Sequence, residues 1–363
     1  MHPMLRMITY GLLGSFGWAS LAHADKVILV AGGGTAGDGS QATTAKLLTP
    51  FGVGFDGTGN LYVVEYTGQR VRRIDPKGII STVAGTGQKG SGGAGGPAIK
   101  AELNDPHSLA VMLNGDVLVA DTMNNRVCRI DGRTGRLTVV AGTGEKGFSG
   151  DGGPATRAQF GNIYCAALDP RGERLYLADL DNRRIRVVDL QTGVVTTVAG
   201  NGQKGVPPDG AEAVKAPLVD PRAVAVDSKG NVYILERGGH ALRVVDRRGT
   251  IRTIAGTGKA GATGDGGDAR TATLNGPKHL CIDLDDNVII ADTENHLIRK
   301  VILSEGKIVR LVGTRERGSA GIGGSPQEAE LNQPHGVYIH PATGDLYIAD
   351  SSNHRVLKIE RSR

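Results

Sequence analysis

The stretch LYIADSSNHRV, residues 346–356, runs from apolar residues through an acidic residue to a polar turn. Five earlier segments repeat this order, and the six acidic residues are Glu65, Asp121, Asp179, Glu236, Asp292 and Asp350. Their successive spacings are 56, 58, 57, 56 and 58 residues. A period this regular over six copies indicates a repeat architecture.

Each repeat contains four candidate strands. The first follows the proline position and is apolar throughout, as in LAVM (109–112). The second carries the acidic residue, the third alternates apolar and polar residues, and the fourth resembles TVVAGTG (138–144). Long helical periodicity is absent, and turn dipeptides separate the runs. Four short strands in each of six repeats predict an all-β fold, a six-bladed β-propeller.

The two ends of the repeat array complement each other. The sixth repeat stops after its third strand, whereas the segment KVILVAGGG (26–34) has the pattern of a fourth strand. We therefore expect residues 26–31 to pair with residues 331–359 in the last blade. This pairing closes the ring and removes its exposed sheet edges.

The first 24 residues have the pattern of a secretory signal peptide. Arg6 precedes an apolar run, and the small-residue sequence AHA (22–24) ends it. We expect cleavage before Asp25, which leaves residues 25–363 as a single propeller domain. The mature chain contains no apolar run long enough to cross a membrane, so a periplasmic or secreted monomer is predicted.

Composition excludes some classes of protein. The net charge of +5 is small for 363 residues, and no basic tract of the kind that binds nucleic acid is present. The three cysteines, Cys128, Cys165 and Cys281, lie in apolar runs at unrelated spacings. They are expected to be buried thiols rather than a disulfide framework.

Two pairs of segments resemble the NHL-repeat family. They are LNDPHSLAV with LVADTMNNRVCRI (103–111, 118–130) and LNQPHGVYI with LYIADSSNHRVLKI (331–339, 346–359). The resemblance extends over residues 26–360 and implies the same propeller fold. It leaves the function open, since such propellers serve as binding platforms, sensor domains, RNA binders and enzymes.

One position in each repeat is expected to face the upper mouth of the axial channel. It follows the proline position before the first strand, and its residues are Phe51, His107, Tyr164, Arg222, Lys278 and His335. Five of these side chains are polar, and their identity varies from blade to blade. This variation favours an asymmetric ligand, and the arginine offers planar donors to a carboxylate or a phosphate.

The histidines of this ring raise the possibility of a metal. The segments DPHSLAV (105–111) and QPHGVYI (333–339) are similar to zinc-ligand segments of peptidylhydroxyglycine amidating lyase. That resemblance implies three zinc-binding histidines in different blades, assisted by a tyrosine and an arginine. His107 and His335 match two of the ligands, but Lys278 stands at the third aligned position. His279 follows it, and a one-residue shift directs that side chain toward the blade interface.

The other acidic and glycine-rich features have structural interpretations. We expect the six turn acids to accept hydrogen bonds from backbone N–H groups. Glu65 and Glu236, whose turns contain glycine, are the two candidates for release to a functional role. Linkers such as AGTGEKGFSGDGGPA (141–155) lack the strand and helix of a phosphate-binding loop. They are expected to be tight turns between blades.

Three functions remain open at this point. The first is an exported module that binds a small anionic ligand or a peptide or protein partner through the upper mouth. The second is a lyase or lactonase-type hydrolase that uses the same ring, assisted by a divalent metal such as zinc. The third is RNA binding, which the export signal disfavours.

Overall fold

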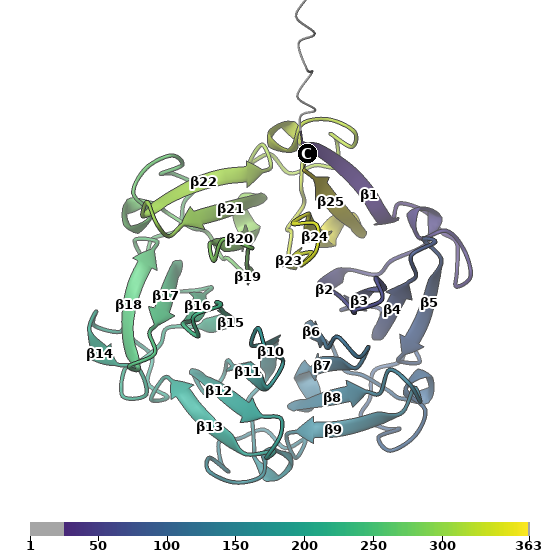
Figure 1. Ribbon diagram of the computed structural model, residues 1–363, viewed down its shortest axis with the longest axis horizontal. Helices are drawn as coiled ribbons and strands as arrows, with labels where there is room; N and C mark the ends of the chain where they lie inside the picture. The colour runs from purple at the N-terminus through teal and green to yellow at the C-terminus, as the bar shows by residue number, and fades with distance from the viewer. Residues whose placement is uncertain (1–24, 362–363) are drawn as a thin grey trace, which may run out of the picture.

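The computed structural model describes residues 25–361, and these residues form a ring of six antiparallel sheets (Figure 1). The predicted six-bladed all-β propeller is therefore confirmed. The predicted signal peptide, residues 1–24, lies outside the described residues. Within the described part of the chain, no helix has the length and apolar character needed to span a membrane.

Each blade contains four strands, which run in order from the axis to the rim. The innermost strands are β2 (Pro50–Phe55), β6 (Ser108–Val111), β10 (Ile163–Leu168), β15 (Pro221–Val226), β19 (His279–Ile282) and β23 (Val337–Ile339). The second strands are β3 (Leu61–Glu65), β7 (Val117–Asp121), β11 (Arg174–Asp179), β16 (Val232–Glu236), β20 (Val288–Asp292) and β24 (Leu346–Asp350). The third strands are β4 (Arg70–Ile74), β8 (Arg126–Ile130), β12 (Arg184–Asp189), β17 (Ala241–Val245), β21 (Leu297–Ile302) and β25 (Arg355–Glu360). The outer strands are β5 (Ile80–Ala84), β9 (Leu137–Ala141), β13 (Val195–Ala199), β18 (Thr250–Ala255), β22 (Lys307–Val312) and β1 (Lys26–Gly32).

Shorter elements lie between these strands. A two-residue strand, β14 (Ala211–Glu212), adds a fifth strand outside β18 in blade four. The 3-10 helices of the linkers between blades are η1 (Ala42–Thr44), η2 (Ala98–Lys100), η4 (Ala155–Arg157), η5 (Ala269–Thr271) and η7 (Pro326–Glu328). The 3-10 helices that follow second strands are η3 (Thr122–Asn124), η6 (Thr293–Asn295) and η8 (Ser351–Asn353).

The ring closes through the N-terminal strand. β1 pairs antiparallel with β25, from Lys26 opposite Glu360 to Gly32 opposite Arg355, in the sheet that also contains β24 and β23. A bulge interrupts the pairing between Leu29 and Ala31. The expected composition of the last blade, with residues 26–31 and 331–359 side by side, is therefore confirmed.

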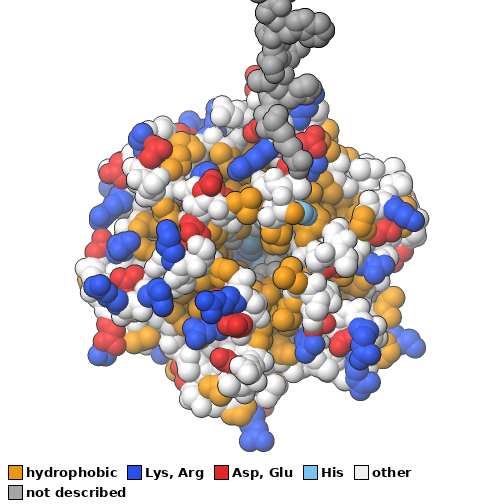
Figure 2. Space-filling view, in the orientation of Figure 1, with side chains coloured by type: hydrophobic (Ala, Val, Ile, Leu, Met, Phe, Trp, Pro, Cys, Tyr) orange, Lys and Arg blue, Asp and Glu red, His pale blue; other side chains and the backbone are white. Residues whose placement is uncertain are grey.

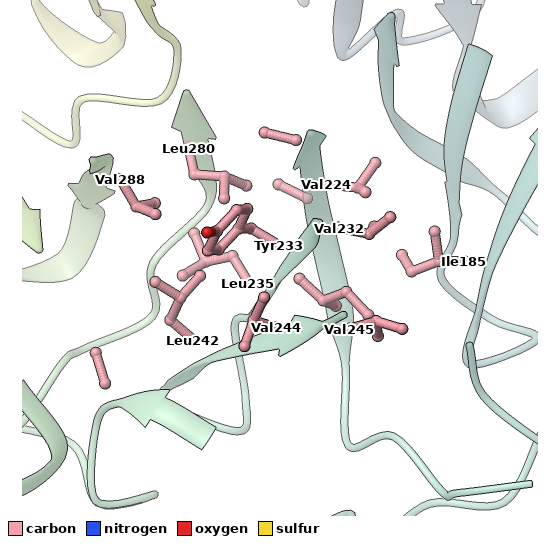
Figure 3. Close-up of a cluster of buried hydrophobic side chains, with 14 of the residues drawn as sticks. Ile185, Val224, Val232, Tyr233, Leu235, Leu242, Val244, Val245, Leu280 and Val288 are labelled. Carbon is pink, nitrogen blue, oxygen red and sulfur yellow. The ribbon is translucent and has the colours of Figure 1, made fainter. Parts of the chain in front are cut away.

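The hydrophobic core lies between successive blades. Second strands such as β7 and β16 are buried at every position, because both of their faces pack on neighbouring sheets. The largest buried cluster joins Ile185 of blade three, Val224 and Leu235 of blade four and Leu280 of blade five (Figure 3). The three cysteines are free thiols, two of them buried and Cys281 partly buried, as their apolar surroundings predict.

The glycine at the end of each outer strand, which follows alanine in five blades and Val312 in the other, has a steric cause. Gly142, which follows β9, has a φ of +92°. A Cβ atom at this position would lie 2.3 Å from the carbonyl oxygen of Asn125. The close approach of two backbones, together with the positive φ, therefore requires glycine.

The blade topology brings two kinds of loop to one end of the ring. We call the loop before each innermost strand the leading loop, and the turn after each second strand the second turn. Innermost and second strands are antiparallel neighbours, as β6 and β7 illustrate. A leading loop and a second turn of the same blade therefore meet at the same end, which we call the upper mouth.

Candidate functional site

The six turn acids fasten the leading loops to the second strands. In each blade one carboxylate oxygen accepts a hydrogen bond from a backbone N–H of the leading loop, as Asp121 Oδ1 does from Asn104 at 2.7 Å. The corresponding pairs are Glu65–Leu48, Asp179–Gly161, Glu236–Val219, Asp292–Asn275 and Asp350–Asn332. All six acids are fully buried, and burial raises the pKa of Asp179 and of Asp292 to about 6. The structural interpretation of these acids is confirmed.

The expectation that Glu65 and Glu236 might be available for function is wrong. Glu65 accepts from the N–H of Leu48 at 2.8 Å and pairs with Arg72 at 3.4 Å. Glu236 pairs with Arg243 at 2.7 Å. Both glutamates thus pair with a buried arginine on the third strand, as Asp121 and Asp350 also do, and neither carboxylate is free.

The six residues predicted to line the upper mouth, which we call the mouth ring, all come from the starts of innermost strands. Phe51, Tyr164 and Arg222 are the second residues of β2, β10 and β15, whereas the other three immediately precede or nearly precede their strands. His107, Arg222 and His335 are buried, and the remaining three are partly exposed. Seen from one end, the centre of the molecule is hollowed, and histidine surface lies inside the hollow (Figure 2).

One side of the mouth ring is an aromatic stack. The Phe51 ring is parallel to that of His335 at 3.9 Å and to that of Tyr66 at 4.5 Å, measured between ring centroids. His107 meets Tyr164 edge to face at 4.5 Å. Sequence reasoning missed Tyr66, which belongs to the second turn of blade one rather than to a leading loop. The sequence feature that could have identified Tyr66 is its position as an aromatic residue directly after the turn acid Glu65.

Arg222 is a buried cation that has no acidic partner among residues 25–361. Its guanidinium lies over the Tyr164 ring, with Cζ 3.8 Å from the centroid, and its Nη2 lies 3.1 Å from His335 Nε2. Within the described part of the chain, the Nε and Nη1 atoms have no hydrogen-bond partner. Burial lowers the pKa of Arg222 to about 10. Two of the three guanidinium nitrogens are therefore desolvated without a hydrogen-bond acceptor, a cost that a bound anion removes.

The two histidines of the ring are neutral, and their tautomers follow from their partners. Arginine only donates hydrogen bonds, so His335 Nε2 is an acceptor and the proton lies on Nδ1. That Nδ1 is buried and has no hydrogen-bond partner among the residues that the structure describes. His107 Nδ1 lies 2.8 Å from the carbonyl oxygen of Asp105, so this nitrogen is the donor and Nε2 remains an acceptor. Burial, followed by repulsion from Arg222, lowers the pKa of both histidines well below the usual value.

Lys278 and His279 are engaged elsewhere. The Lys278 ammonium forms an ion pair with Glu294 at 2.8 Å, so its charge is compensated within blade five. His279 Nδ1 accepts from the N–H of Val337 in blade six at 3.4 Å. This side chain therefore lies at the blade interface, as the one-residue shift predicts. Burial lowers its pKa to about 4.

The donor set does not fit a zinc ion. The ring centroids of His107 and His335 are 6.1 Å apart, and His335 Nε2 already receives a hydrogen bond from the cationic Arg222. Among residues 25–361, no group of three or more His, Cys, Asp or Glu side chains is arranged to hold a metal. A second cation next to Arg222 would be repelled, so the mouth ring is unsuited to a metal ion.

Family profiles match most of the ring. A profile described as the teneurin NHL domain matches residues 27–92 and 161–263, and a profile described as the NHL repeat matches residues 103–130 and 331–359. The chain belongs to the NHL-repeat family. Its six blades thus have both the sequence pattern and the architecture of an NHL propeller.

Relatives and solved structures share parts of this NHL propeller. Protein SUPPRESSOR OF QUENCHING 1, chloroplastic, from Arabidopsis thaliana is 30% identical over 271 residues, which are 71% of this chain and 25% of that protein. Teneurin-3 from Mus musculus is 30% identical over 255 residues, which are 61% of this chain and 9% of that protein. The chain therefore spans a quarter or less of the length of these two relatives. The crystal structure of an auxiliary nutrient binding protein from Bacteroides thetaiotaomicron superposes with a TM-score of 0.66 at 17% identity, covering 93% of this chain and 77% of the other.

Proposed function

We propose that this NHL propeller binds a small carboxylate ligand at its upper mouth, with Arg222 as the principal contact. The observation that supports the proposal is the set of unpaired donors. Arg222 Nε and Nη1 and His335 Nδ1 are all buried, all donors and all without partners. A carboxylate supplies acceptors for a planar guanidinium in a bidentate geometry.

The neighbouring side chains favour a ligand with an apolar, planar part. The Phe51 ring is stacked on Tyr66 at the mouth, and Tyr164 carries the guanidinium of Arg222 on its face. Aromatic rings such as Tyr66 at the end of this stack pack on planar groups. His107 Nε2 remains available as an acceptor for a hydroxyl group of the ligand.

We also propose that the protein acts outside the cytoplasm, as an exported monomer. The signal-like sequence of residues 1–24 supports this interpretation. The auxiliary nutrient binding protein of similar fold is an example of this architecture in a protein described as a binder. Mass determination of the exported protein tests the proposal, which requires cleavage before Asp25.

Calorimetric titration with benzoate and benzamide tests the carboxylate site. The two probes share a flat ring and differ in charge, so the wild-type protein is expected to bind benzoate at least tenfold more tightly. Arg222→Met is expected to remove this preference, because two-thirds of the unpaired donors belong to Arg222. Arg73→Gln removes one exposed positive charge from β4 and serves as the control.

Equal affinity for benzoate and benzamide would contradict the proposal, as would an Arg222→Met variant that still prefers benzoate. A preference lost in both Arg222→Met and Arg73→Gln would also count against the site. That result would mean that net charge alone attracts the anion.

A further inference from the structure

Five of the six blade junctions share a side-chain hydrogen bond that we call the junction latch. The last residue of each second turn has a left-handed backbone, and its side chain accepts from the backbone N–H of the next blade's leading loop. In blade two, Asn125 Oδ1 accepts from Asn162 at 2.9 Å. The other four latches are Gln69–Asp105, His240–Gly276, His296–Gln333 and His354–Thr49.

The junction between blades three and four lacks this latch. Arg183 occupies the latch position, with a φ of +49° beside +51° for Asn125. An arginine side chain has no acceptor, so it cannot take the N–H of Asp220, the residue equivalent to Asn162. Among the described residues, the Arg183 side chain forms neither an ion pair nor a hydrogen bond. The backbone is therefore the same as at the other junctions, but the side chain is a free cation.

A second contact is also absent at this junction. Lys89, in the linker before blade two, forms an ion pair with Asp105 of the following leading loop at 2.7 Å. Lys204 and Asp220 have the same sequence spacing two junctions later. Asp220 instead accepts from Arg237 Nε at 3.0 Å and from the N–H of Gly238 at 3.1 Å. Within residues 25–361, Lys204 is consequently left without an acidic partner.

These changes coincide with a pocket. A cavity of about 460 Å³ opens at this junction, lined by Arg183, Lys204, Arg237, Lys146, Asp181 and Asp220 together with apolar neighbours. Lys146 is neutralised by Asp181 at 2.6 Å and Arg237 by Asp220. The two remaining charges, Arg183 and Lys204, give the pocket an excess of two positive charges.

We propose that the pocket between blades three and four is a second anion site, which binds a phosphate group through Arg183 and Lys204. A phosphate group carries close to two negative charges and several acceptor oxygens, which match two uncompensated cations. The guanidinium supplies a planar fork and the ammonium a mobile point charge. The unlatched N–H of Asp220 adds a backbone donor at the same junction.

The decisive variant is Arg183→Asn, which installs the latch side chain of Asn125 and removes the free guanidinium. Asparagine tolerates the left-handed backbone, so this variant is expected to fold and to close the junction. Lys204→Gln removes the second cation and leaves the turn untouched. Arg133→Asn makes the same change as the first variant on an exposed turn outside the pocket and is the matched control.

Binding is measured by calorimetry with inorganic phosphate, glycerol 1-phosphate and inorganic sulfate on the full mature chain at constant ionic strength. We expect saturable binding at one site, a loss of at least tenfold in Arg183→Asn and in Lys204→Gln, and unchanged affinity in Arg133→Asn. Tighter binding of the ester supports a phosphorylated ligand, and tighter binding of orthophosphate supports the free ion.

The proposal is overturned if no probe saturates, if sulfate binds more tightly than both phosphates, or if Arg183→Asn binds like the wild type. Arg222→Met separates this site from the carboxylate site. It is expected to leave phosphate affinity within twofold of the wild type, so the failure of one proposal does not imply the failure of the other.

Discussion

Arg222 is the side chain on which the proposed carboxylate site depends most. Buried arginines elsewhere in the ring, such as Arg299, pair with acids, here Asp265 at 2.8 Å and Asp292 at 3.3 Å. Arg222 instead contacts an aromatic face and a neutral histidine. The proposed anion site thus lowers the stability of the unliganded protein, as functional sites commonly do.

Arg222→Met is therefore expected to stabilise the unliganded protein by about 1–3 kcal/mol, because it removes unsatisfied buried donors and a desolvated charge. Urea denaturation at neutral pH measures this change in the free energy of unfolding. Arg73→Met, on the exposed side of β4, is the control and is expected to change it by less than about 0.5 kcal/mol. A less stable Arg222→Met variant would show that the guanidinium is a structural part of the mouth.

At the residue scale, the sequence predicts where a side chain lies in the ring better than it predicts that side chain's ion pairs and hydrogen bonds. The repeat register placed Arg222 and His335 in one ring, and they are in contact. The ion pair of Lys278 with Glu294 depends on side-chain conformations across sixteen residues, which a repeat alignment does not contain. Arg183 stands out in an alignment of second turns, but the latch that it replaces is visible only in three dimensions.

The second turn with its acid is the element that fixes each leading loop, and through it the mouth ring. Asp121 serves three donors in blade two: the N–H of Asn104, the amide of Asn124 and Nε of Arg126, at 2.7–2.8 Å. All of these groups are largely buried. The repeat is therefore held by a local polar network in addition to its apolar core.

Asp121→Ala is expected to destabilise the protein by about 3–5 kcal/mol, since it leaves the buried Arg126 without its carboxylate. Thermal and urea unfolding measure the loss. Asp285→Ala, an exposed acid in the turn before β20, is the control and is expected to change stability by less than about 0.5 kcal/mol. A tolerant Asp121→Ala variant would contradict the role of the acid as the fastener of the loop.

The whole molecule depends on the contact between its two ends. Deleting residues 26–32 removes β1, strips the outer neighbour from β25 and exposes apolar surface that Val27 and Ala31 cover. The shortened chain is expected to lose thermal stability and to associate through the free edge of β25. Light scattering after size-exclusion chromatography measures the association. A monomeric deletion variant with an unchanged unfolding temperature would show that ring closure contributes little.

The pairing of β1 with β25 also explains why the fold could be predicted from the sequence. The last repeat lacks a fourth strand, and residues 26–34 have the pattern of an additional one. The sequence therefore predicts that the two pair, and in the structure β1 pairs with β25. Five blades need only local pairing between consecutive strands, which repeat periodicity reveals directly. The bulge at Leu29–Ala31 was not predicted, because it depends on how the outer strand curves over its neighbour.

The pairing of β1 with β25 also sets an order of events during synthesis. The strand that leaves the ribosome first must wait for the strand that leaves it last, while the blades between them can pair as they emerge. Until then, the nascent chain is an open arc with an unpaired segment at its front. Completion of the ring thus depends on a single late step, and a propeller that stops short of residue 355 has no partner for β1.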